Sequence, residues 1–470
     1  MKKRVLFAVF MLSAFFMMEM QAQSFSLKGE FRPRVELRNG YKTLLPSKIM
    51  LASGELAKIS PALFVSQRSR LTFDYKSDAL KVGFSLQNVG VWGESKTLSS
   101  SDVNGIQVNE AWGQFRLAKG VELKVGRQAI VYDDQRIFGG VNWAQQGRSH
   151  DAAVLKLSPF GGKCKIDLGF AFNANKESVF GEPYAVANNY RTLQYMHYHR
   201  DFNNIGVSFL FLNNGKANSI QVKEGDDLLK TEAISFSQTI GPRFTYKVGK
   251  LKANAAFYYQ MGDLAKSTSI NEDGNLEMNT AEVKAMYAGA DVSYQVMDGF
   301  TAGLGFEYLS GSDDKFNEET KELTHSNAKT FNPLYGTNHK FNGWMDYFYV
   351  GFPNRTGLID IYLPLKYKYK KTTFGLTAHS FMAAAKVMDL KIDETKAITP
   401  ITMDAGLGTE FDFSVAYPVS KSVILKAGYS HMLPTETMKI VKNPGADLDR
   451  TSNWAWMMLV IKPTFFTSGK

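Results

Sequence analysis

Hydrophobic and polar residues alternate along most of the chain, and the period of the alternation is two residues. In segment 25–38 the apolar side chains from Leu27 to Leu37 share one face, and charged side chains occupy the other. The same pattern returns over 165–173 and 251–260. Strands of this length with one apolar and one polar face are typical of a β-barrel wall in a lipid bilayer.

The connections between the expected strands alternate between short and long. Strands are expected at 25–38, 61–76, 79–92, 106–117, 121–132, 150–158, 163–174, 189–201, 203–213, 232–247, 250–262, 281–296, 299–310, 355–370, 371–386, 405–418, 420–431 and 451–466. The long loops are then 39–60, 93–105, 133–149, 175–188, 214–231, 263–280, 311–354, 387–404 and 432–450. The pattern predicts an all-β transmembrane antiparallel barrel of about 18 strands with short periplasmic turns and long extracellular loops.

The N-terminus has the form of a secretory signal peptide. A basic start, Lys2 to Arg4, precedes an apolar run over 5–18, and we expect cleavage after Ala22. The domain organisation is then a signal peptide, 1–22, and a single barrel, 23–470. The protein is expected to leave the cytoplasm through the Sec route and to reside as an integral protein in the bacterial outer membrane, in contact with lipid and lipopolysaccharide.

A large soluble all-β fold is the alternative to a membrane barrel. A propeller would show a repeat of blade length with short loops on both sides, and the sequence has no such repeat. The C-terminal segment, with Trp454, Trp456 and the pair Phe465–Phe466, has the pattern of a closing strand with an aromatic anchor. The only cysteine, Cys164, excludes an internal disulfide and an N-terminal lipid anchor.

Charge suggests what the barrel passes. The chain has a formal net charge of +10, and removing Lys2, Lys3, Arg4 and Glu19 with the signal peptide leaves +8. Arginines gather on the polar face of the early strands, and arginine in a confined pore favours anions. The expected pore-lining and anion-binding residues of these strands are Arg32, Arg34, Arg68, Arg70 and Arg116. The structural alternative is that these arginines pair with Glu30, Glu36, Asp74 and Glu110 to stabilise an ordinary barrel interior.

One segment carries a recognisable motif. It reads Val125-Gly-Arg-Gln128, then Asp134-Gln-Arg-Ile-Phe-Gly139, Asn142-Trp143, Gln145-Gln-Gly-Arg-Ser149 and Asp151. This segment resembles the signature of the alginate-export family of outer-membrane channels, as a distant member. The resemblance implies an eighteen-stranded barrel with a positively charged pore for a polyuronate, and it implies a basic channel role for Arg127, Arg136 and Arg148.

The same segment suggests a loop that folds into the barrel. Loop 133–149 and its flank contain Asp133, Asp134 and Asp151, which we expect to pin the loop to the wall, and the pinned loop would narrow the pore. Simple alternation places Arg127 on the lipid side, where a charge near the midplane costs ~2–4 kcal/mol. We expect a bulge near Gly126 to turn it inward, and a position at the membrane interface is the alternative.

The longest loop, 311–354, is the second candidate for folding inward. Its run from Phe331 to Tyr349 is rich in aromatic and asparagine residues. Such residues suit the stacking of sugar rings, or they form the apolar cluster that keeps a long loop ordered. The candidates for sugar stacking are Trp143, Tyr335, Trp344 and Tyr347.

Catalysis is not expected. Asp133, Asp134, His150 and Asp151 resemble an acid–base group, but they fall inside the channel motif beside arginines that give them structural partners. His197 and His199 share a strand face without a further ligand. The sequence predicts no metal site, no cofactor and no nucleic-acid partner.

Two functions remain open at this stage. The first is a channel that passes anionic solutes, such as the acidic polysaccharide alginate, together with periplasmic export partners. The second is a barrel plugged by its loops that captures glycans or has a structural role at the surface. A route for hydrophobic solutes is a weaker third possibility, because the polar face carries Arg32, Arg34, Arg68 and Arg70.

Overall fold

The computed structural model describes residues 23–50, 53–98, 103–224, 227–270, 276–348 and 355–469. The expected signal peptide, 1–22, and the end of the loop 311–354 lie outside the described residues. The barrel strands are β1 Ser24–Asn39, β4 Ala62–Lys76, β5 Leu80–Val91, β6 Gln107–Ala118, β7 Val121–Gln128, β8 His150–Leu157, β9 Cys164–Phe172, β10 Thr192–Phe202, β11 Ile205–Glu224, β12 Asp227–Val248, β13 Leu251–Ile270, β14 Leu276–Met297, β15 Phe300–Leu309, β18 Leu358–Tyr369, β19 Thr372–Met382, β22 Gly406–Ser420, β23 Val423–Pro434, β24 Ser452–Ile461 and β25 Thr464–Ser468.

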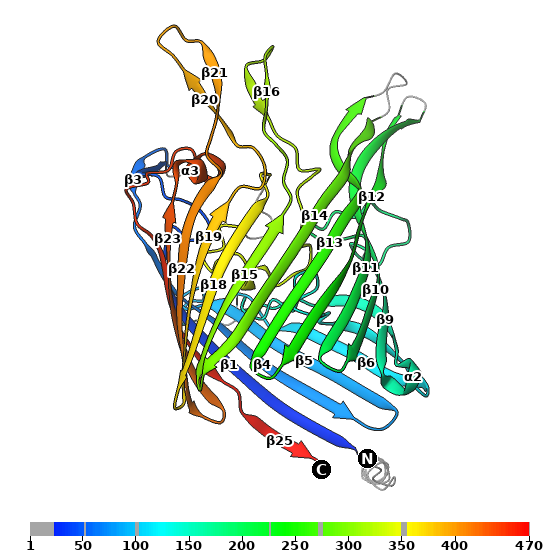
Figure 1. Ribbon diagram of the computed structural model, residues 1–470. Helices are drawn as coiled ribbons and strands as arrows, with labels where there is room; N and C mark the ends of the chain where they lie inside the picture. Colours follow the sequence, from blue (N-terminus) through cyan, green and yellow to red (C-terminus); the bar gives the residue numbers. More distant parts are fainter. Residues whose placement is uncertain are drawn as a thin grey trace.

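The sheet closes on itself (Figure 1). Consecutive strands pair antiparallel, and β24 pairs with β1, with Trp456 opposite Glu36. The last segment, β25, continues the line of β24 along the start of β1, so that Phe466 lies opposite Leu27. The nineteen segments of the sheet therefore form eighteen barrel strands within the described residues, and the predicted all-β, closed antiparallel barrel and its strand number are confirmed.

Four strands are longer than the sequence pattern predicted. Segments 214–231 and 263–280 were expected to be loops, but their described residues, 214–224, 227–231, 263–270 and 276–280, continue the hairpins β11–β12 and β13–β14. Both segments have a polar stretch without a clear apolar face, which reads as a loop, although their Ser, Thr, Val and Ile residues also favour strands. Figure 1 shows β12, β13 and β14 rising beyond β15.

The remaining elements belong to the connections. They are β2 Lys48–Met50, β3 Leu56–Lys58, α2 Pro159–Gly162, β16 Lys315–Asn317, β17 Glu322–Thr324, the 3-10 helix η1 Asn338–Lys340, β20 Met388–Ile392, β21 Ile398–Thr402 and α3 Glu436–Lys442. Among the described helices, none has the length and the apolar character needed to cross a membrane.

The barrel has its apolar side chains outside and its charged side chains inside. On β22, Phe411 and Phe413 are 41% and 43% exposed, whereas Glu410 and Asp412, which alternate with them, are 0% and 1% exposed. This arrangement is the reverse of a soluble protein. It follows from the period-two pattern, because successive strand residues point to opposite faces of the sheet.

We predict that Phe413→Arg destabilises the barrel in a bilayer. Phe413 is in the middle of β22 and points outward, and an arginine at the bilayer midplane costs ~2–4 kcal/mol in a barrel. The free energy of unfolding in lipid vesicles, measured by urea titration, should fall by about that amount, and the control Phe413→Leu should stay close to wild type. Equal stability of the arginine variant would show that this face does not meet lipid.

Candidate functional site

The lumen has a basic wall formed by β1 and β4. Arg32 and Arg68 lie opposite each other in register, and Arg70 lies opposite Glu30. Arg32, Arg34 and Arg68 are buried, and Arg68 is 0% exposed. Burial inside the lumen means that another part of the chain covers these guanidinium groups.

The covering segment is the connection between β7 and β8, which folds into the barrel. Arg32 Nη1 donates to the carbonyl oxygen of Asn142 at 2.7 Å, and Arg34 Nη1 donates to that of Trp143 at 2.8 Å. Arg68 Nη2 donates to Asn142 Oδ1 at 2.8 Å. The basic wall therefore hydrogen-bonds the backbone of residues 142–144, which would otherwise be buried without partners.

Trp143 is the centre of the contacts between this loop and the wall. The guanidinium of Arg34 lies 4.3 Å from the centroid of its ring, and His339 stacks on it at 4.7 Å. Trp454 and Trp456 pack edge-on against it. An arginine over an indole face adds a cation–π attraction to the hydrogen bonds of the wall.

A second part of the lumen wall is acidic. Glu307 on β15, Asp360 on β18, and Glu410 and Asp412 on β22 are all buried and point inward. The backbone N–H of Met345 donates to Glu410 Oε1 at 2.8 Å, and that of Trp344 donates to Asp412 Oδ2 at 3.1 Å. The second in-folded loop, between β15 and β18, thus presents N–H groups to carboxylates. This acidic wall was not predicted, although acidic residues on the inward face of the expected strands 299–310, 355–370 and 405–418 were a signal for it.

Arg136 joins the first loop to the acidic wall. Its side chain is 1% exposed, and Nη2 donates to Glu307 Oε2. Asn342 from the second loop donates to the same oxygen at 2.6 Å, and the ring of Phe341 lies 4.0 Å from the guanidinium. Arg136 is therefore part of a buried ion-pair network that fixes both loops.

The two loops are also bound to each other. The backbone N–H of Gly139 donates to the carbonyl of Tyr335 at 2.8 Å, and that of Thr337 donates to the carbonyl of Gln135 at 2.9 Å. Glycine at 139 permits this approach, because a Cβ there would lie 2.2 Å from Thr337 Oγ1. We call the paired segments 132–148 and 331–348 the plug.

Asp133 and Asp134 connect the plug to a third part of the wall. His197 Nε2 lies 3.0 Å from Asp133 Oδ2, and Ser208 donates to Asp133 Oδ1 at 2.6 Å. Arg243 Nε donates to Asp134 Oδ2 at 3.1 Å. Burial alone would raise the pKa of Asp133, but the contacts with His197 and Ser208 and the charge of Arg243 lower it below its ordinary value.

Asp151 does not contact the plug, and the expected bulge near Gly126 is absent. The β6–β7 and β7–β8 registers run through Gly126 without a shift. Arg127 therefore stays on the outward face, 43% exposed, where Nη1 donates to Asp151 Oδ2 at 2.8 Å. The two residues lie directly opposite each other, so a cross-strand ion pair takes the place of the predicted inward turn.

The other predicted site residues are distributed over several environments. Arg70 donates to Gln87 Oε1 at 2.6 Å, Arg148 donates to the carbonyl of Gly336 at 3.0 Å, and Arg116 is exposed near the end of β6. Tyr347 is buried and its hydroxyl donates to the Gly40 carbonyl, whereas Tyr335 is half-buried and its hydroxyl donates to Asn214. Both rings pack within the plug, and Trp143 and Trp344 are half-buried like Tyr335.

The residues weighed for catalysis are not brought together as an acid–base group. His150 Nδ1 lies 3.1 Å from the hydroxyl of Tyr190, and its neighbour Asp151 pairs with Arg127. Asp133 contacts His197 instead. Within the described ranges, no group of three or more His, Cys, Asp or Glu residues is placed to hold a metal ion.

Comparison with known proteins identifies the family. The sequence profile of the family described as "Alginate export" matches residues 61–450. The chain belongs to the alginate export family. No curated protein sequence matches it.

Solved structures of outer-membrane porins share the fold. OccK9 (OpdG) of Pseudomonas aeruginosa has a TM-score of 0.55 at 13% identity, over 94% of this chain and 98% of that chain. OccAB4 of Acinetobacter baumannii has a TM-score of 0.55 at 11% identity, over 95% of this chain and 99% of that chain. OccK2 (OpdF) of P. aeruginosa, solved in complex with glucuronate, has a TM-score of 0.53 at 12% identity, over 94% of this chain and 98% of that chain. The family and the fold together make this protein an outer-membrane β-barrel of the channel type.

We predict that Arg136→Ala destabilises the protein and that the effect depends on Glu307. Removing one partner of a buried ion pair leaves an uncompensated charge, which typically costs about 3–5 kcal/mol. The double variant Arg136→Ala/Glu307→Ala should lose clearly less free energy of unfolding than the sum of the two single variants, because each single variant leaves the other buried group without its partner. Unfolding followed by tryptophan fluorescence would measure this, and strict additivity would refute the coupling.

Proposed function

We propose that this channel passes anionic solutes along its basic wall, and that acidic polysaccharide such as alginate is among them. The excess of positive charge on β1 and β4 carries the proposal. Arg32, Arg34, Arg68 and Arg70 lie there, and the carboxylates that pair with arginines of this wall are Glu30 and Glu36. The third carboxylate of the two strands, Asp74, pairs with Lys28 instead. The bonds from these arginines to neutral carbonyls satisfy donors without cancelling charge, so the wall keeps a positive potential that attracts anions.

A cavity beside this wall suits an acidic sugar. It has a volume of about 570 Å³ and is lined by Trp143, Tyr41, Arg38 and Lys42, among others. The side chain of Arg38 is 34% exposed and that of Lys42 is 50% exposed. Aromatic rings next to exposed cations offer a stacking face for a sugar and a partner for its carboxylate. Of the predicted stacking residues, Trp143 is the one that this cavity supports.

The carboxylates at this cavity are already engaged. Glu36 accepts hydrogen bonds from Arg34 and Arg38, and Asp346 accepts from the hydroxyl of Tyr41. The third carboxylate, Glu94, accepts from the backbone N–H of Val91 and from the side chain of Asn104. A passing anion therefore meets cations more readily than it meets free carboxylates. Diffusion past these fixed charges requires no cofactor and no catalytic step.

The orientation in the membrane is part of the proposal. We place the short connections in the periplasm and the long ones outside the cell. This orientation fits the chain ends, because β1 starts and β25 finishes at the end of the barrel that carries the short connections (Figure 1). The outer apolar face then meets lipid and lipopolysaccharide, and export partners of the periplasm would approach the short turns. The role of Arg148 in conduction stays a prediction, as do export by the Sec route and removal of segment 1–22. Arg127, on the outward face, is not part of this proposal.

The plug supports a second candidate, a closed barrel that captures glycans or has a structural role. Its segments 132–148 and 331–348 contribute Phe138, Phe331 and Met345 to a buried apolar cluster. Purified protein in planar bilayers separates the two functions. Anion-selective current supports the channel, whereas the absence of current together with retained glycan binding supports the closed module.

We predict that Arg38→Glu/Lys42→Glu shifts the reversal potential in a salt gradient toward cations. Both side chains are partly exposed at the cavity, so reversing their charge changes the local potential there. Because Arg38 pairs with Glu36 and Lys42 pairs with Asp346, folding of the double variant is first verified by circular dichroism. The matched control is Lys321→Glu, in the connection between β16 and β17, which should conduct like wild type. An unchanged ion preference in the double variant would remove this cavity from the conduction path.

A further inference from the structure

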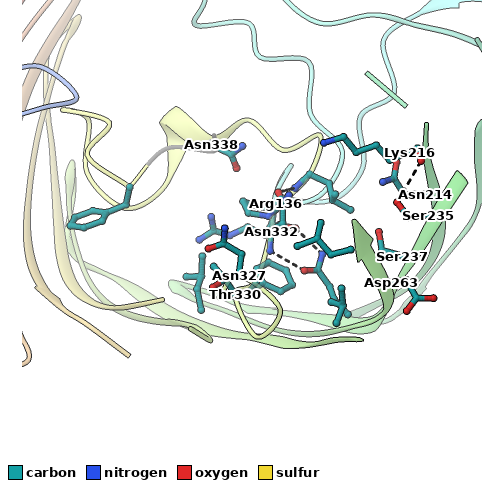
Figure 2. A pocket seen from close by; sticks show the side chains of 18 of the residues that line it. Arg136, Asn214, Lys216, Ser235, Ser237, Asp263, Asn327, Thr330, Asn332 and Asn338 are labelled. Atoms are coloured by element: carbon teal, nitrogen blue, oxygen red, sulfur yellow. Dashed lines mark hydrogen bonds between the residues drawn. The ribbon is translucent and has the colours of Figure 1, made fainter. Parts of the chain in front are cut away.

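One cavity of this barrel lies on its outward face, away from the lumen. The cavities inside the lumen contain several polar side chains, and Figure 2 shows this for one of about 360 Å³, whose lining includes Asn214, Ser237 and Asn332. The outward cavity has a volume of about 490 Å³ and is lined mainly by apolar residues of β1, β4, β5 and the C-terminal segment. Its composition is therefore that of a site for hydrocarbon.

The lining side chains belong to the face of the sheet that meets lipid. Phe31 on β1 and Leu71 on β4 are 39% and 43% exposed, and both line the cavity. Glu30, Arg70 and Gln87 also line it, but they alternate with the outward residues, and Arg70 donates to Gln87 on the lumen side. The cavity is thus continuous with the outer apolar face of the barrel.

The C-terminal segment closes one end of the cavity. β24 ends at Ile461, and the chain continues through Pro463 into β25, which places the ring of Phe465 over Gly29. A Cβ at position 29 would lie 2.6 Å from Cε2 of that ring, so glycine allows the ring to lie against the sheet. The end of the cavity nearest the short connections is therefore apolar, with Ile461, Pro463 and Phe465 in its lining.

The other end of the cavity is polar. Ser69 on β4 and Asn88 on β5 lie directly opposite each other, and both are half-buried. Asn88 is about 10 Å along the strand from the end of β5, and its Nδ2 donates to the carbonyl of Gly105 at 2.8 Å. The hydroxyl of Ser69 accepts from Gln67 at 3.3 Å, and a hydroxyl with one accepted bond keeps a donor and a second lone pair.

This change from apolar to polar matches a lipid of the outer leaflet. In the proposed orientation the long connections lie outside the cell, so the polar end of the cavity is directed toward the outer surface of the membrane. Ser69 and Asn88 are uncharged, which suits a hydroxyl group better than a phosphate. A second copy of the chain would need a broad contact of roughly 800 Å² per partner, whereas this feature is a local hollow.

We propose that the cavity binds one acyl chain of lipid A, the membrane anchor of lipopolysaccharide. The chain lies against Phe31, Leu71 and Phe465, where dispersion contacts with the apolar wall hold it. The hydroxyl of a hydroxylated acyl chain bonds the hydroxyl of Ser69. This lipid site goes beyond the proposed function and rests on it only for the orientation of the barrel in the membrane.

The experiment is native mass spectrometry of the detergent-purified protein after removal of lipid. The probes are lipid A with hydroxylated acyl chains and a phosphatidylethanolamine, which has no such hydroxyl. Wild type should retain one lipid A per chain and bind it more tightly than the phospholipid. Leu71→Trp fills the cavity from its apolar side, and it should weaken the binding of lipid A about tenfold because the ring takes the place of the acyl chain.

A second variant tests the polar end. Ser69→Ala leaves the cavity open and removes the hydroxyl, so lipid A should bind about threefold more weakly while the phospholipid is unaffected. The matched controls are Leu363→Trp on β18, where Leu363 is 45% exposed on the outward face, and Ser380→Ala on β19. Both control variants should bind lipid A like wild type.

Three results would overturn the site. They are wild-type retention of lipid A by Leu71→Trp, tighter binding of the phospholipid than of lipid A by wild type, and a dimer of wild type that Leu71→Trp dissociates. The last result would assign this face to a second copy of the chain. Bilayer recordings read the channel function separately, because anion-selective current without lipid retention overturns the site alone, and lipid retention without current contradicts the channel alone.

Discussion

The need to satisfy buried backbone groups governs the interior of this barrel. A loop that folds into the lumen buries N–H and C=O groups without a neighbouring strand to pair with, and each unpaired group costs roughly 1–3 kcal/mol. The walls solve this problem with opposite charges. Arginines of β1 and β4 donate to the carbonyls of 142–144, and carboxylates of β22 accept from the N–H groups of Trp344 and Met345.

This arrangement joins two interpretations of the arginines that looked like alternatives in the sequence. Arg32, Arg34 and Arg68 do hold the interior together, because they bind the plug and lie near Glu30 and Glu36. Their charge persists all the same, since carbonyl oxygens are neutral. A plug anchored in this way narrows the lumen and leaves a cavity on either side, with guanidinium groups at one and amides at the other.

The local pattern of the sequence predicted the barrel. The interior of the barrel depends on contacts between segments that are distant in the sequence, and these contacts could not be predicted from local patterns. Period-two alternation located all eighteen strands, and the motif around Arg136 located the first in-folded loop. The partners of that loop could not be predicted in this way. Arg136 and Glu307 are 171 residues apart, and the local pattern around either residue gives no information about the other. Arg127 shows a different limit. An outward arginine looked too costly, and Asp151 on the next strand, which compensates it, becomes its neighbour only once the register is known.

The plug as a fixed part of the lumen is the central claim, and hydrogen exchange followed by mass spectrometry tests it most directly. With the protein in detergent micelles or nanodiscs, peptides covering 134–148 and 336–348 should exchange nearly as slowly as peptides from β22 and β23. The exposed hairpin β20–β21 provides the fast reference within the same molecule. Exchange of the two plug segments at the rate of that hairpin would contradict the account, because it would mean that the charged walls do not hold the loops in place.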